Sequence, residues 1–166
     1  HQSHFDILGA ISKGHMTRSQ IKSLAGTATD FHLDRLEKSF NVISKVNPIS
    51  SKKTARDSRF EIEDPFLKFW FKFVHSNSSA VEMGNYEYIR AHIERDFSTF
   101  SGLELESLFK AILSESKLFG QIGGYWNSKG TDEIDIVAIN QLEKRVLIAE
   151  VKRNQSKYNE NVLIAE

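Results

Sequence analysis

Residues 134–152 carry the sequence IDIVAINQLEKRVLIAEVK, which decides the fold of the second half of the chain. Its two ends, residues 134–139 and 146–152, are rich in Ile, Val and Leu, as β-strands are. The polar residues 140–145 lie between them and suit a turn. The stretch therefore predicts an antiparallel hairpin in a small α/β core.

The register of this hairpin would place acidic side chains opposite each other. If the turn is symmetric about Leu142 and Glu143, Asp135 lies across from Glu150, with Cβ atoms about 5 Å apart. Lys152 shares their face, because side chains alternate along a strand. Two carboxylates on an otherwise apolar face repel each other unless a cation lies between them. We therefore expect a divalent ion held by Asp135, Glu150, a backbone carbonyl and waters, with Lys152 placed to stabilise a hydroxide or the charge on a scissile phosphate.

A helix from about Gly102 is expected to precede this hairpin and to supply a third acid. Its apolar side chains recur at helical spacing and should lie on the sheet. Glu106 sits at the edge of that face, from which its carboxylate can reach the rim of the sheet. Residues 119–126, with Gly123 and Gly124, suit the first strand. The alternative is purely structural, because charges are common at strand ends. The expected apolar face consists of Leu105, Leu108, Phe109, Ile112 and Leu113.

The first 63 residues suggest a second, different module. Apolar spacing predicts a helix that ends at Gly14, and a Thr17–Gln20 capping box begins another that ends at Gly26. A third helix should start near Thr29. Residues 42–46 and 59–62 have the composition of strands and flank a basic loop. Such helices followed by a hairpin predict a winged helix, in which the third helix enters the major groove.

Basic side chains of this module are candidates for contact with DNA. On the third helix, Asp30, Asp34 and Glu37 would repel phosphate. A module for protein–protein contact or a hinge, with the same fold, therefore stays open as an alternative. The candidate contacts are His32, Arg35 and Lys38 on the helix and Lys52, Lys53, Arg56 and Arg59 on the wing.

The stretch between the two modules is an aromatic helical connector. Asp64 suits an N-cap and Pro65 the first helical position. Residues 66–74 are apolar nearly all round, which favours a helix buried between neighbours over a set of rings that stack on bases. A further helix is expected over residues 86–96.

Composition excludes several classes of protein. The 166 residues contain 22 Lys and Arg against 22 Asp and Glu, so any contact with nucleic acid must come from a local patch. The absence of Cys excludes disulfides and zinc ribbons. The apolar run at residues 66–74 is too short to span a membrane. We expect a cytoplasmic location, and the ends of the chain suggest part of a longer protein.

The acidic residues and their order resemble the PD-(D/E)XK nuclease superfamily. Glu106, Asp135 and Glu150-Val151-Lys152 match its motif in an α-β-β-β order, with Ile134 in place of the usual proline. Residues 59–71, 102–106, 124–126 and 133–138 resemble, more narrowly, the C-terminal region of archaeal-type AAA+ ATPases. The resemblance implies an α+β chain with a winged helix at residues 1–63, a connector at 64–100 and a nuclease-like domain at 101–166.

The same resemblance implies a function and its cofactors. Glu106, Asp135 and Glu150 would hold Mg²⁺ or Mn²⁺, and Lys152 would orient the water that attacks a DNA phosphodiester. An ATPase domain would precede this region, and ATP would act only through that domain, because the chain has no GxxxxGK[ST] loop. The alternative is a non-catalytic DNA-sensing or regulatory region of an AAA+ or STAND-type protein. The expected partners are DNA and the ATPase domain, with no membrane, and a homo-oligomer is compatible with the sequence.

Overall fold

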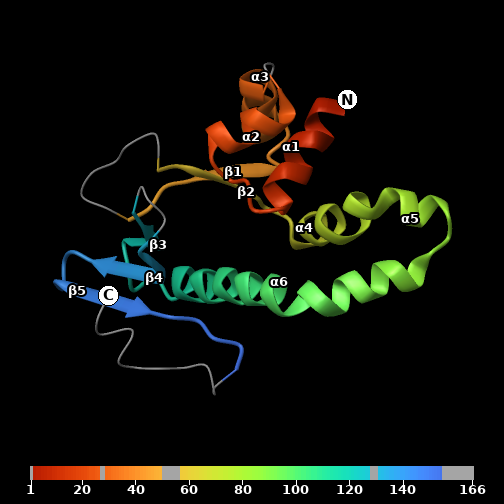
Figure 1. The fold of residues 1–166 in the computed structure, drawn as a ribbon. Helices are drawn as coiled ribbons and strands as arrows, with labels where there is room; N and C mark the ends of the chain where they lie inside the picture. The colour runs from red at the N-terminus through yellow and green to blue at the C-terminus, as the bar shows by residue number, and fades with distance from the viewer. Residues whose placement is uncertain (1, 27–28, 50–56, 128–130, 155–166) are drawn as a thin grey trace. The chain divides into compact units, whose positions relative to one another are not determined.

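The computed structural model describes residues 2–26, 29–49, 57–127 and 131–154, and shows a mixed α+β chain (Figure 1). Contacts divide the chain into two compact units. The first, which we call the helical unit, comprises His1–Val46 and Ser58–Phe97. The second, the sheet unit, comprises Asn47–Asp57 and Ser98–Glu166.

The helical unit begins with helices whose ends follow from local sequence. They are α1 (Gln2–Ser12), α2 (Arg18–Ala25) and α3 (Thr29–Asp34), the last continuing into the π-helical turn η1 (Arg35–Ser39). Thr17 forms the expected capping box, in which its own N–H donates to Gln20 Oε1 at 3.0 Å. Gly26 ends α2 at a φ of 87°, a conformation that suits glycine.

A hairpin packs against these helices. Strand β1 (Ile43–Val46) pairs antiparallel with β2 (Arg59–Ile62), and Ile43 lies opposite Ile62. Thr17, before α2, forms an isolated bridge with Arg59 of β2. The helices and the hairpin thus occur in the order that the sequence predicted. Their shared core contains Ile7, Leu8, Ile11, Ile21, Leu33, Leu36, Ile43, Phe60, Ile62 and Phe71.

The aromatic connector is mainly part of this core. It consists of α4 (Pro65–Phe69), the π-helical turn η2 (Trp70–Val74), the 3-10 turn η3 (His75–Asn77) and α5 (Ser78–Glu82). The Asp64 side chain caps α4 by accepting from Leu67 N at 2.8 Å. Phe71 and Phe73 are 3% and 1% exposed, whereas Phe66 is 68% exposed, so the second part of the connector is core and its first turn is not.

Helix α6 (Tyr86–Glu115) corrects two expectations. It runs without a break through Gly102, where the sequence suggested that a separate helix begins. A single glycine costs a helix only about 1 kcal/mol, which neighbouring turns can offset. Its apolar face is also less covered than expected, because Leu108 and Ile112 remain 54% and 51% exposed. Helical spacing groups apolar side chains on one face but does not supply a partner for that face.

The sheet has the strand order β3-β4-β5. Its strands are β3 (Gln121–Trp126), β4 (Glu133–Asn140) and β5 (Arg145–Ala149), and a bulge between Gly123 and Tyr125 interrupts the β3–β4 pairing. Ile136 pairs with Ala149 and Asn140 with Arg145, which is the register predicted from a turn centred on Leu142 and Glu143. Strand β5 ends earlier than expected, just before Glu150.

The connection between β1 and β2 belongs to the sheet unit. Ile49 N donates to Gly124 O at 2.8 Å, and Trp126 Nε1 donates to Asp57 O at 2.7 Å. These bonds attach both ends of the expected basic loop to β3. The sequence predicted boundaries at residues 63 and 100. The two compact units differ from that division, because residues 47–57 belong to the sheet unit and residues 64–97 to the helical unit.

Among the helices built from the described residues, none has the length and apolar character needed to cross a membrane.

The capping box provides a test of the helical unit. Thr17→Ala removes the hydroxyl that receives Gln20 N–H, so the free energy of unfolding should fall by about 1 kcal/mol in urea titrations. Thr17→Ser keeps a hydroxyl at the same position and should lose much less. Equal unfolding midpoints for Thr17→Ala and the wild type would show that the cap does not stabilise α2.

Candidate functional site

The β4–β5 register brings Asp135 and Glu150 together. Since Ile136 pairs with Ala149, the next positions outward on the two chains are Asp135 and Glu150. The two side chains are only 16% and 15% exposed. Asp135 Oδ2 accepts from Val151 N at 2.8 Å, which fixes its carboxylate against the chain that carries Glu150. The structure thus places Asp135 and Glu150 side by side.

Lys152 lies beside both carboxylates. Its Nζ donates to Glu150 Oε2 at 2.7 Å and lies 4.0 Å from Asp135 Oδ2. The hydrogen bond to Glu150 raises the pKa of Lys152 despite its partial burial, and the charge of Asp135 acts in the same direction. The ammonium group is therefore firmly charged and offsets part of the negative charge of the pair.

Glu150 ionises less readily than an exposed carboxylate does. Burial raises the pKa of Glu150, its hydrogen bond with Lys152 opposes that change, and the neighbouring Asp135 carboxylate adds to it. A raised pKa means that ionising Glu150 costs more free energy in the folded chain than in water. An additional cation would remove this cost.

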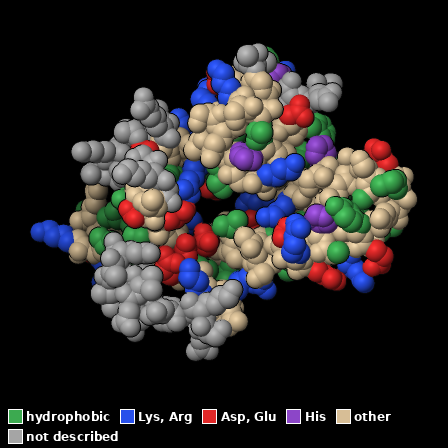
Figure 2. Space-filling view, viewed as in Figure 1, with side chains coloured by type: hydrophobic (Ala, Val, Ile, Leu, Met, Phe, Trp, Pro, Cys, Tyr) green, Lys and Arg blue, Asp and Glu red, His purple; other side chains and the backbone are tan. Residues whose placement is uncertain are grey.

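Glu106 shares this electrostatic environment from α6. Burial raises its pKa to about 7, and the negative charges of Asp135, Glu133 and Glu150 contribute in the same direction. Lys110, one turn further along α6, opposes the change. Figure 2 shows Asp and Glu side chains gathered where the sheet and the C-terminal half of α6 lie in Figure 1.

Sequence reasoning missed Glu133 and Lys110 as members of this environment. Glu133 is two residues before Asp135 on β4 and so shares its face, a signal that strand alternation could have supplied. Lys110 follows Glu106 by four residues, the spacing at which helical side chains are neighbours.

The donor set fits a divalent metal in part. Two carboxylates at one point offer the oxygen ligands that Mg²⁺ and Mn²⁺ prefer. Within the described residues, however, no three side chains of His, Asp or Glu approach closely enough to hold one ion together. The charges of Asp135 and Glu150 thus help to raise the pKa of Glu106, although Glu106 does not form a three-ligand group with them among the described residues.

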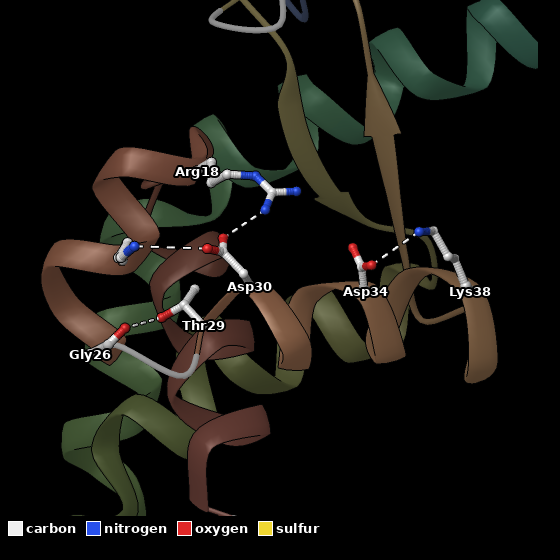
Figure 3. Close-up of polar contacts among 7 residues, drawn as sticks. Arg18, Gly26, Thr29, Asp30, Asp34 and Lys38 are labelled. Atoms are coloured by element: carbon white, nitrogen blue, oxygen red, sulfur yellow. Dashed lines mark hydrogen bonds and ion pairs between the residues drawn. The ribbon is translucent and has the colours of Figure 1, made fainter.

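Among the residues expected to contact DNA, those of the third helix each have a neighbour within the helical unit. Lys38 pairs with Asp34 at 3.0 Å (Figure 3), and His32 Nδ1 lies 3.1 Å from His4 Nε2. Arg35 lies over the rings of Phe31 and Phe40. Arg59 is half-buried at the start of β2, the strand that the sequence predicted at residues 59–62. Lys52, Lys53 and Arg56 lie outside the described residues.

Fold and site together define a class: an α+β chain with two small sheets, one of which carries a mostly buried pair of carboxylates joined by a lysine. Residues 70–163 match the DUF234 family, described as archaeal and bacterial proteins of unknown function, and the chain belongs to that family. An uncharacterized protein of Methanocaldococcus jannaschii is 32% identical over 157 residues, which cover 88% of this chain. The chain spans about a third of that relative's length, 34%. No solved structure matches the chain.

The raised pKa of Glu106 predicts how stability changes with pH in metal-free buffer. Between the ordinary value of 4.5 and about 7, the folded chain retains a proton that the unfolded chain has released. The free energy of unfolding should therefore fall as the pH rises through this window, by on the order of 1 kcal/mol once partial solvent exposure is considered. Glu106→Gln should remove most of this fall, as measured by urea unfolding across the window in EDTA, and the raised pKa of Glu150 should leave a smaller one.

Glu115→Gln is the matched control, because Glu115 is exposed at the end of the same helix. This variant should keep the wild-type pH dependence. The interpretation would be wrong if Glu106→Gln lost stability with rising pH as steeply as the wild type does.

Proposed function

We propose that the chain is a metal-dependent nuclease module that hydrolyses a DNA phosphodiester bond. The observation that carries the proposal is the meeting of Asp135, Glu150 and Lys152 at the open end of the β4–β5 hairpin. Two acids and a lysine in that order are also the residues on which the resemblance to PD-(D/E)XK nucleases depends. The family match names no activity, so the chemistry of these side chains is the support.

Each side chain would have a distinct task. Asp135 and Glu150 would bind Mg²⁺ or Mn²⁺, which supplies a Lewis acid and an activated water. The Val151 N–H already holds Asp135 in one orientation, which reduces the cost of ordering that ligand. Glu106, whose pKa is about 7 without metal, would release its proton as the cation binds and would then add negative charge beside it.

Lys152 would act on the substrate and not on the metal. In the structure its Nζ is bound to Glu150 Oε2 at 2.7 Å. When a cation compensates Glu150, this ammonium group becomes available to orient the attacking water or to donate to a phosphate oxygen. Its high pKa keeps it protonated at neutral pH, as a donor to an anion must be.

The helical unit would position this site on DNA. Its helices and hairpin, α1 to β2, have the order of a winged helix. The M. jannaschii relative is about three times as long as the aligned region, as the 34% coverage implies, which leaves room for a further domain in such a protein. We propose that this region follows an AAA+ ATPase domain, as in the ATPases that the sequence resembles.

A non-catalytic role is the second candidate. The observation that favours it is that Lys152 already pairs with Glu150 while no three acidic or histidine side chains of the described residues converge on one point. In that case the chain would be a DNA-sensing or regulatory region of an AAA+ or STAND-type ATPase, and the acids a structural remnant.

Metal binding should be visible as a gain in stability. Titration with Mg²⁺ or Mn²⁺ should raise the melting temperature of the wild-type chain, because the unfolded chain does not hold Asp135 and Glu150 together. At about 100 times the dissociation constant the gain would be about 2.7 kcal/mol. Asp135→Asn should lose most of this gain and should be more stable than the wild type without metal, since the repulsion with Glu150 is gone.

The control for this titration is Asp6→Asn, an exposed carboxylate on α1. It should respond to metal as the wild type does. Equal metal-induced shifts in wild type and Asp135→Asn would rule out the site as described.

Cleavage separates the two candidate functions. Lys152→Ala should retain the metal-induced gain in melting temperature but lose cleavage of linear DNA by at least about a hundredfold, because its role is on water and phosphate. Lys13→Ala removes an exposed lysine that directly follows α1, and this variant should cut at the wild-type rate. A wild-type chain that binds metal, with its ATPase domain present, and still leaves DNA intact would support the non-catalytic role.

A further inference from the structure

A cluster of rings surrounds one arginine on the surface of the helical unit. The Arg35 guanidinium lies 5.1 Å from the centroid of the Phe40 ring and 5.8 Å from that of Phe31. His32 contacts Phe31, and His4 on α1 contacts both His32 and Phe40, with ring centroids 4.6–5.7 Å apart. We call these five side chains the Arg35 cluster.

The Arg35 cluster presents both π surfaces and a positive charge to solvent. Phe31 is 63% exposed and Phe40 is 48% exposed, although large aromatic side chains usually bury most of their area. Arg35 is exposed as well, and in the described part of the chain no carboxylate pairs with it. A guanidinium that lies on rings, without a counter-ion, can accept an anionic ligand.

Two of the three acids on the same helix are paired with cations other than Arg35. Asp30 pairs with Arg18 at 2.6 Å, and Asp34 with Lys38 at 3.0 Å (Figure 3). Asp30 and Asp34 also lie four residues apart on a different stripe of the helix from Phe31 and Arg35. The phosphate repulsion expected from the sequence is therefore reduced at the cluster.

The same contacts argue against reading of duplex DNA by this helix. A base pair is read in the major groove by polar groups that extend freely toward base edges. Here Lys38 is engaged by Asp34 and His32 by His4. Exposed rings next to a cation are instead the combination that binds unpaired bases.

We propose that the Arg35 cluster binds single-stranded DNA. Two neighbouring bases would stack on Phe31 and Phe40, and the phosphate that joins them would lie on Arg35. The arrangement matches a dinucleotide, in which one anion lies between two bases, as one cation lies here between two rings. The inference rests on the proposed function for its assignment to DNA, but not on the metal site.

Binding of single-stranded DNA can be measured by fluorescence anisotropy with the whole chain in EDTA, so that no cleavage occurs. The probe is a labelled oligodeoxythymidylate of roughly 12 nucleotides, a length within the site sizes of single-strand binders. The wild type should bind it more tightly than a duplex of equal length. Phe31→Ala and Phe40→Ala should each weaken binding about tenfold, and Arg35→Gln should weaken it and flatten its salt dependence.

Matched controls remove a similar side chain outside the cluster. Phe66→Ala deletes a ring that is 68% exposed, and Arg90→Gln deletes an exposed arginine paired with Glu87. Both should bind the strand as the wild type does. Circular-dichroism melts of every variant verify that the fold is kept.

Several results would overturn the proposal. One is that Phe31→Ala leaves the affinity for the oligodeoxythymidylate unchanged. The others are that the wild type binds the duplex, or an oligouridylate, more tightly than it binds the oligodeoxythymidylate. Aromatic rings with arginine are also common at protein interfaces, so self-association that the variants abolish, with unchanged strand affinity, would assign the cluster to a protein contact. Because EDTA removes metal, failure here is distinguishable from failure of the nuclease assignment, which would appear as absent metal-induced stabilisation.

Discussion

The pairing register of β4 with β5 is the constraint on which the site depends. A slip of one residue would turn every side chain of β5 to the other face and separate Glu150 from Asp135. The turn between the strands fixes the register locally, where Asn140 Oδ1 accepts from Glu143 N at 3.0 Å. The Val151 N–H bond to Asp135 then fixes the far end of the same ladder. Turn and carboxylate thus define one alignment from opposite ends.

That alignment creates a pair of acids whose charge must be balanced. The structure balances it with Lys152, and the proposed mechanism balances it with a cation. In the proposed mechanism, a cation bound at Glu150 Oε2 would take the oxygen that accepts from Lys152, so metal binding would release the ammonium group. A carboxylate pair that is mostly buried makes this exchange energetically significant, because burial weakens the solvation that otherwise screens such charges.

The helical unit is organised differently, around an apolar core with polar and aromatic groups left at its surface. Phe60, Ile21 and Leu33 are almost fully buried. Phe31 on α3 and Phe40 at the end of η1 are largely exposed. Burial of the first set stabilises the unit, which leaves the second set available for a ligand. The residues between β1 and β2 belong to the sheet unit, so a loop that would serve as a DNA-binding wing is attached at both ends to β3.

The sequence by itself determined what short-range rules control. Alternation and turn symmetry located Asp135 opposite Glu150, and the capping residues Thr17 and Asp64 located the starts of α2 and α4. Only the tertiary structure decided that α6 continues through Gly102, that Leu108 and Ile112 stay half exposed, and that Ile49 bonds to Gly124. It also decided that burial and the charges of the acid pair raise the pKa of Glu106. The physical reason is that these features depend on which distant segment covers a face or edge, and periodicity within a segment carries no information about its partner.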